Sequence, residues 1–261
     1  MNRDRRRYSK TWAVIVGLCI VCGILSQAHA QGPRGYYEPE SNGPIDAEFS
    51  FVRLRYSSAG GRGGRGGPSW LTDCQPWDPC AELHLLKGVT RLTRVRVGEP
   101  RTASLLDDNL MDFPWLYAVE VGHWYLSDLE ATRLREYLDR GGFLMVDDFW
   151  GPQEWFIFTE SMTRVFPDRP IVELAESHPL LHVLYDLDQR TQIPGRGGNR
   201  YGTTPHWRGI FDDDNRLMVA INFNMDMGDA WEHADDPSYP EPMTALAYKF
   251  AMNYVIYSMT H

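Results

Sequence analysis

Residues 139–151, Asp-Arg-Gly-Gly-Phe-Leu-Met-Val-Asp-Asp-Phe-Trp-Gly, constrain the fold more than any other stretch of this chain. A helix end and a glycine pair lead into an apolar run at 143–146, which finishes in two adjacent carboxylates, Asp147 and Asp148. This order is typical of a helix that returns the chain to a buried strand. Open α/β sheets bind ligands outside the carboxyl ends of their strands. The sequence therefore predicts a candidate site at the two aspartates, but it does not indicate a substrate.

Strand and helix patterns alternate along the chain. Strands are predicted at residues 49–56, 92–97, 113–120, 143–146, 171–174 and 216–221. Helices are predicted at residues 79–88, 127–141, 152–165 and 243–259, and the second of these opens with a capping box formed by Ser127 and Glu130. The alternation predicts an α/β fold, a three-layer sandwich with a mostly parallel sheet.

The first 30 residues have the pattern of a signal peptide. Five basic residues precede an apolar run at 12–25, and Ala28-His29-Ala30 supplies the small residues of a cleavage site. The run is shorter than the roughly 20 apolar residues that span a bilayer, so no stable membrane anchor is expected after cleavage. We expect export to the periplasm or the medium of a bacterium. A disordered linker is predicted at 31–47, followed by one domain at 48–261.

Removal of the leader makes the chain more acidic. The full chain has 26 basic and 35 acidic side chains, of which residues 1–30 carry five and one. Residues 31–261 therefore have 21 and 34, a formal net charge of −13. An acidic surface repels nucleic acid and anionic lipid, so neither is expected as the main partner.

Cys74 and Cys80 are the two cysteines outside the leader. Their short separation and an oxidising compartment favour a local disulfide. Two buried free thiols are the alternative interpretation. A metal-binding pair is least favoured, because no histidine or further cysteine flanks them at ligand spacing.

Several short motifs carry a resemblance to a known family. They occupy residues 51–56 (Phe-Val-Arg-Leu-Arg-Tyr), 70–73 (Trp-Leu-Thr-Asp), 113–117 (Phe-Pro-Trp-Leu-Tyr), 141–151 and 222–226 (Asn-Phe-Asn-Met-Asp). Together they resemble the bacterial family catalogued as domain of unknown function 4159. The resemblance implies a class I glutamine-amidotransferase-like, flavodoxin-like fold, and it implies no activity. Cys74 and Cys80 depart from the family pattern, which has a tyrosine near Cys74.

The implied fold leads to a negative prediction. In amidotransferases the strand that follows the capped helix leads to a cysteine on a tight elbow, but here the matching positions are occupied by 147–151, Asp-Asp-Phe-Trp-Gly. No Gly-x-Ser-x-Gly motif replaces the cysteine. Acyl transfer requires an activated thiol or hydroxyl, so glutaminase activity is not expected.

Polar side chains gather where the predicted strands end. The candidate pocket comprises Glu120, His123, Asp147, Asp148, Trp150, Asn224 and Asp226, and Asn222, Asp229 and Glu232 lie nearby in the sequence. Crowded carboxylates raise one another's pKa or recruit a cation, and His123 would serve as a ligand or proton shuttle. Under the alternative interpretation, which we favour, Asp147 and Asp148 cap the following helix and bind the loop at 122–124. No cofactor and no metal ligand set is predicted.

Two classes of function remain open. The favoured one is a non-catalytic module that binds a ligand or a protein partner. Carbohydrate is one ligand class, since tryptophans near the predicted cleft suit sugar stacking, although tryptophan is more often buried in a core. These tryptophans are Trp124, Trp150, Trp155, Trp207 and Trp231. The alternative is a carboxylate- or metal-dependent hydrolase that uses Glu120, His123, Asp147 and Asp148.

Overall fold

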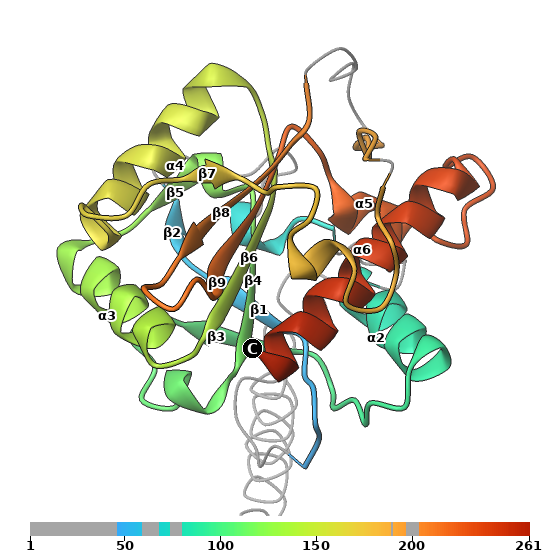
Figure 1. Cartoon of the computed structure of the whole chain (residues 1–261), viewed down its shortest axis with the longest axis horizontal. Coiled ribbons are helices and arrows are strands. Elements are labelled where there is room, and N and C mark those ends of the chain that lie inside the picture. Colours follow the sequence, from blue (N-terminus) through green and yellow to red (C-terminus); the bar gives the residue numbers. More distant parts are fainter. Residues whose placement is uncertain (1–45, 59–67, 74–79, 189, 197–203) are drawn as a thin grey trace, which may run out of the picture. The chain divides into compact units, whose positions relative to one another are not determined.

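The structure is a computed structural model that describes residues 46–58, 68–73, 80–188, 190–196 and 204–261 (Figure 1). The predicted signal peptide and all but the last two residues of the predicted linker lie outside the described residues. Cys74 also lies outside them, so the disulfide to Cys80 stays a prediction. Cys80 itself is buried and precedes the first turn of helix α2 (Ala81–Leu92).

Seven strands form the main sheet, in the spatial order β3-β1-β4-β6-β9-β8-β7. They are β1 (Val52–Arg55), β3 (Arg101–Ser104), β4 (Trp115–Val119), β6 (Phe143–Phe149), β7 (Val172–Glu173), β8 (His206–Phe211) and β9 (Leu217–Phe223). A separate pair joins β2 (Ser57–Ser58) and β5 (Trp124–Tyr125). The first five strands of the spatial order are parallel, β8 is antiparallel to β9, and β7 is antiparallel to β8. The prediction of an α/β fold with a mostly parallel sheet is therefore confirmed.

Helices cover both faces of the sheet (Figure 1). They are α2, α3 (Asp128–Asp139), α4 (Gly151–Val165), α5 (Met227–Glu232) and α6 (Glu241–Thr260), with short 3₁₀ turns η1 (Ser69–Leu71), η2 (Leu110–Asp112), η3 (Val121–His123) and η4 (Pro179–Leu181). Helices α3 and α4 pack on one face, and α2, α5 and α6 pack on the other. Each face has its own apolar core, because the strands of the parallel sheet are buried on both sides.

The order of strands reverses at β1. This strand pairs with β3 on one side and with β4 on the other, although β4 follows β3 in the sequence. The connection from β1 to β3 therefore runs to one side of β1, and the connection from β3 to β4 brings the chain to the other side. A ligand crevice in an open α/β sheet forms at such a reversal, outside the carboxyl ends of the strands.

The start of α3 is confirmed by its capping box. The Ser127 hydroxyl accepts the backbone N–H of Glu130, and the Glu130 carboxylate accepts the backbone N–H of Ser127 at 2.8 Å. These reciprocal bonds satisfy two N–H groups that the helix itself cannot pair.

The segment after Cys80 differs from the prediction. Helix α2 does not end at Gly88 but continues to Leu92, and the strand predicted at 92–97 is wrong. Val97 forms only an isolated bridge to Phe49, and the neighbouring strand is β3. Gly88 does not end the helix but allows α2 to pack closely against α6, since a Cβ there would lie 2.3 Å from the ring of Tyr248 on α6.

Several elements were not predicted, and one strand is longer than predicted. The additional elements include strands β2, β3, β5 and β8 and helix α5. Strand β6 runs through both aspartates to Phe149. The pairing of β6 with β9 shifts register between Val146 and Phe149, which marks a bulge at the aspartates. Among the described residues, no helix is both long and apolar enough to cross a membrane.

Candidate acidic site at the strand ends

Carboxylates gather at the carboxyl edge of the sheet. Parallel strands all end at this edge, so the last residues of β6 and the residues that follow β9 meet there. The group, here called the acidic cluster, comprises Asp73, Asp147, Asp148, Asp226, Asp229 and Glu232. All but Asp229 are buried.

Left-handed backbone conformations surround the acidic cluster. In the described part of the chain five non-glycine residues have positive φ, and four of them lie at this edge: Asp73 (59°), Glu120 (50°), Asp148 (48°) and Asn224 (62°). Each such conformation costs free energy in an L-residue, although Asp and Asn tolerate it better than most. Strain of this kind concentrates at functional sites.

The bulge in β6 lets two adjacent aspartates serve one cluster. On a regular strand, successive side chains point to opposite faces of the sheet. Asp148 has a left-handed φ of 48° within the register shift, so the alternation is broken. Burial is the main cause that raises the pKa of Asp226, and the charges of Asp148 and, to a lesser extent, Asp147 add to it.

Asp147 connects β6 to the start of α5. Its Oδ2 accepts hydrogen bonds from the backbone N–H groups of Met227 (2.7 Å) and Gly228 (3.1 Å) and from the hydroxyl of Tyr117 (3.2 Å). Burial raises the pKa of Asp147 to about 7, although these donors act in the opposite direction. Its second oxygen, Oδ1, is buried and accepts no hydrogen bond from the described residues.

Asp73, Asp148 and Asp226, here called the aspartate triad, form the densest part of the cluster. Each offers a carboxylate oxygen, and these oxygens all lie within 4.8 Å of one another. Burial, followed by the charges of Asp229 and Asp148, raises the pKa of Asp73 well above its ordinary value. Burial and the charges of Asp148 and Asp229 do the same for Asp226. The triad therefore stores electrostatic repulsion that a bound cation would relieve.

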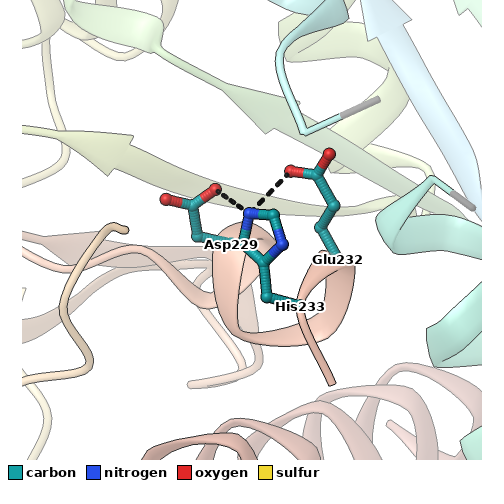
Figure 2. Close-up of side chains that lie close together, drawn as sticks. All are labelled: Asp229, Glu232 and His233. Atoms are coloured by element: carbon teal, nitrogen blue, oxygen red, sulfur yellow. Dashed lines mark ion pairs between the residues drawn. The ribbon is translucent and has the colours of Figure 1, made fainter. Parts of the chain in front are cut away.

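Three residues of α5 and its end form a second group beside the triad (Figure 2). The Nε2 atom of His233 lies 3.7 Å from Asp229 Oδ1 and 3.5 Å from Glu232 Oε2. On the other side of the ring, His233 Nδ1 lies 3.2 Å from Arg196 Nη1. An arginine N–H can only donate, so Nδ1 accepts and the ring proton is on Nε2, facing the two carboxylates.

Arg53 holds the segment that carries Asp73. This fully buried guanidinium on β1 bonds Glu82 of α2, and it donates to the backbone carbonyls of Trp70 (3.1 Å) and Thr72 (2.9 Å). Asp73 follows directly and is buried with a left-handed φ. The Arg53 charge lowers the pKa of Asp73, but burial and the neighbouring carboxylates dominate.

A comparison with protein families identifies the family of the chain. The family model described as Domain of unknown function (DUF4159) matches residues 51–259. The chain belongs to this family. The match includes all seven strands of the main sheet and the whole acidic cluster. No curated protein matches the chain.

The triad of this DUF4159 domain comes from three separate motifs: 70–73 supplies Asp73, 141–151 supplies Asp148 and 222–226 supplies Asp226. The sequence prediction included the last two aspartates and omitted Asp73, although its motif was part of the family resemblance. The signal that could have identified Asp73 is its place as the last residue of the motif at 70–73. Its position depends on Arg53, a charged residue within an apolar strand pattern, whose burial could not be anticipated.

Trp150 and Asn224, two other predicted pocket residues, support the cluster. The indole Nε1 of Trp150 donates to Asp148 Oδ1 at 2.6 Å. Asn224 accepts the first backbone N–H of α4, from Gly151, at 2.9 Å and donates to the carbonyl of Thr204 at 2.8 Å. The cap of α4 is thus provided by Asn224, while Asp147 binds the start of α5.

Glu120 and His123 lie at the margin or outside the cluster. The backbone carbonyl of Glu120 accepts a hydrogen bond from the hydroxyl of Tyr56 at 2.9 Å. Burial raises the pKa of Tyr56, and the charges of Glu120 and Asp148 add to this effect. His123 is exposed, and its Nε2 lies 3.6 Å from a carboxylate oxygen of Glu154 on α4. Asn222, which bonds Tyr254 at 2.6 Å, is a buried structural residue.

Most of the tryptophans proposed for sugar stacking are core residues. Trp124, Trp150, Trp207 and Trp231 are buried. Trp155 is half-buried and lies under the guanidinium of Arg208, whose Cζ is 4.4 Å from the ring centroid. The four buried tryptophans therefore cannot serve as an open stacking platform.

Proposed function

We propose that this DUF4159 domain is an exported, non-catalytic binding module. Its ligand binds at the carboxyl edge of the sheet and brings positive charge to the aspartate triad. The leader pattern at 1–30 supports export to the periplasm or the medium. The net charge of −13 outside the leader agrees with a positively charged ligand or a basic protein partner.

We further propose that the fold is amidotransferase-like and flavodoxin-like. The five parallel strands, numbered in chain order, lie in the order 2-1-3-4-5, with two additional strands at one edge. This order is that of flavodoxin-like domains, whose ligands bind at the reversal next to the first strand. Tyr56 follows β1 and Glu120 follows β4, the strand paired with β1, so both lie beside this reversal.

The convergence of three buried carboxylates carries the proposal. A purely structural network would satisfy its members, because buried charges without partners are costly. Here the pKa values of Asp73, Asp147 and Asp226 are all raised, so the ionised cluster destabilises the fold. Proteins retain such groups where function requires them.

Catalysis has less support than binding. At the strand end where an amidotransferase has its cysteine, this chain has Asp148 and Phe149, so a glutaminase nucleophile is missing there. For the hydrolase alternative, the pKa of Asp147 near 7 suits a general acid or base. However, Asp147 Oδ2 is bound to the start of α5, and His123 points to Glu154 outside the cluster.

The stability of Asp148→Asn and Asp226→Asn variants tests the proposal without knowledge of the ligand. Asparagine keeps the acceptor for Trp150 Nε1 at position 148 and the acceptor for the Asp229 N–H at position 226. If the cluster is a binding site, each substitution removes a charge that repels the other carboxylates. The free energy of unfolding of each variant should then exceed that of wild type by about 1 kcal/mol or more at pH 8. Urea denaturation measures this change. Lower stability in both variants would show that the carboxylates are a structural network.

A further inference from the structure

We infer that the aspartate triad binds a hard divalent cation, namely Mg²⁺, Mn²⁺ or Ca²⁺, with Asp73, Asp148 and Asp226 as ligands. This inference rests on the proposed function and identifies the class of ligand at that site. The remaining coordination positions belong to water or to oxygen atoms of a second ligand that the cation would bridge to the protein.

The donor set defines the class of cation. All three groups are carboxylates, and one oxygen from each lies within 4.8 Å of the others. Oxygens bound to one cation at about 2.1 to 2.5 Å are at most about 4 to 5 Å apart. A triad without imidazole or thiolate suits Mg²⁺, Mn²⁺ or Ca²⁺ better than Zn²⁺ or copper.

An unpaired carboxylate oxygen of the triad points independently to a bound cation. Asp73 Oδ2 is buried and accepts no hydrogen bond from the described part of the chain. It lies against Gly228, where a Cβ would be 2.1 Å from this oxygen and 2.8 Å from the hydroxyl of Tyr117. Asp147 bonds the same glycine and the same hydroxyl through Oδ2. Asp73, a member of the triad, therefore keeps a buried oxygen that a cation would satisfy.

The buried arginine does not neutralise the cluster. Arg53 is paired with Glu82, and its other hydrogen bonds go to the carbonyls of Trp70 and Thr72. Its single charge is therefore shared with a carboxylate outside the cluster. Within the described residues, the hydrogen bonds of Arg53 thus go to Glu82 and to two carbonyls, and not to a carboxylate of the triad.

The neighbouring histidine group does not complete the ligand set. Arg196 Nη1 donates to His233 Nδ1, which leaves the ring proton on Nε2 and no lone pair toward Asp229 and Glu232. Asp229 Oδ2 also accepts the backbone N–H of Arg196 at 2.5 Å. Arg196 therefore ties His233 and Asp229 to the segment at 190–196, and the triad remains as the cation ligands.

Calorimetric titration of the EDTA-treated protein with MgCl₂, MnCl₂ and CaCl₂ tests the inference. We expect saturable binding of at least one of these ions at a single site. Asp73→Asn and Asp148→Asn should each weaken binding by about tenfold or more, because loss of a ligand costs at least as much as loss of a ligand's hydrogen-bond partner. His123→Gln, outside the cluster, is the matched control and should bind like wild type. Terbium luminescence gives a second readout, since Trp150 contacts Asp148 and would sensitise a bound lanthanide.

The outcomes separate the inference from the proposed function. Circular dichroism first establishes that each variant is folded, and Asp226→Asn replaces any variant that is not. If no divalent ion binds, or if binding survives the triad substitutions, the cation inference is overturned. The proposed function then still stands if the Asn variants are more stable than wild type. If they are less stable, the proposed function fails irrespective of the titrations.

Discussion

The indole Nε1 of Trp150 donates a 2.6 Å hydrogen bond to Asp148 Oδ1, which couples the start of α4 to the end of β6. The backbone N–H of Trp150 in turn donates to Glu154 Oε2 at 2.6 Å, one turn into the helix. The Asp148 carboxylate is therefore oriented by a side chain whose own position is set by a helix cap. Such support is what holds a ligand-binding group in place.

Replacing Trp150 with phenylalanine tests this support. The substitution keeps an aromatic ring but removes the donor to a carboxylate, so we expect a loss of about 1–3 kcal/mol in the free energy of unfolding. Divalent-cation affinity should fall as well, because Asp148 loses its orientation. Urea denaturation and calorimetric titration measure the two effects.

Trp124→Phe is the matched control for that variant. Trp124 is buried and stacks on Phe158 of α4, and its Nε1 donates no hydrogen bond within the described residues. It should lose stability through packing alone and keep its cation affinity. Equal loss of affinity in both variants would contradict a specific role for the Trp150 hydrogen bond.

Substitution of Arg53 should have two separable effects, one on the free energy of unfolding and one on the position of Asp73. Arg53→Met leaves Glu82 as a buried charge without its partner, which should cost about 3–5 kcal/mol in the free energy of unfolding. Adding Glu82→Leu removes that charge and should recover much of the loss. Cation affinity should stay low in the double variant, because the carbonyls of Trp70 and Thr72 still lack their donor. A double variant no more stable than the single one would refute the ion-pair explanation.

The sequence was sufficient to predict the layers of the fold and part of the site. Local signals such as the Ser127 capping box act over a few residues, so they fix a helix start without tertiary information. Parallel strands end at one edge, so Asp148 and Asp226 could be expected to approach each other. These predictions depend only on periodicity and on the connectivity of α/β sheets.

Tertiary contacts explain what the sequence did not predict. Gly88 resembles a helix terminator, but it is a packing contact with Tyr248, 160 positions later in the chain. The position of Asp73 follows from the buried pair between Arg53 and Glu82, and a charge pattern alone gives no reason to bury an arginine. Tertiary contacts decide which charged residues become buried, so the sequence pattern alone does not reveal them.

The pH dependence of stability should reveal the raised carboxylate pKa values. The folded-state pKa of Asp147 is about 7, above its ordinary 3.8, and those of Asp73 and Asp226 are raised as well. Between pH 4 and 7 the folded state thus binds more protons than the unfolded state. The contribution of these groups to stability is therefore greatest below about pH 4 and decreases as the pH rises to about 7.

Comparison with Asp226→Asn isolates this effect from the other titrating groups. The variant should gain free energy of unfolding relative to wild type as the pH rises from 5 to 8, because it lacks one of the repelling charges. Urea denaturation at several pH values measures the difference. A difference that does not change with pH would show that Asp226 titrates normally in the folded protein.

Gly228→Ala should destabilise the protein although it improves helix propensity. Alanine is favoured over glycine within a helix by about 1 kcal/mol. On α5, however, the new Cβ would lie 2.1 Å from Asp73 Oδ2 and 2.8 Å from the hydroxyl of Tyr117. We expect a net loss of about 1–3 kcal/mol, as for other overpacked sites, together with weaker cation binding.

A second substitution distinguishes the Asp73 contact from a general defect of α5. Glycine at position 73 removes the carboxylate and suits the left-handed φ of 59°. Gly228→Ala combined with Asp73→Gly should therefore recover most of the stability measured by urea denaturation, while divalent-cation binding stays absent because a ligand is missing. If the double variant is as unstable as Gly228→Ala alone, the close approach of Asp73 to α5 is not the cause. Recovery of stability without recovery of binding would identify Asp73 as a group that the fold retains for its ligand and not for its packing.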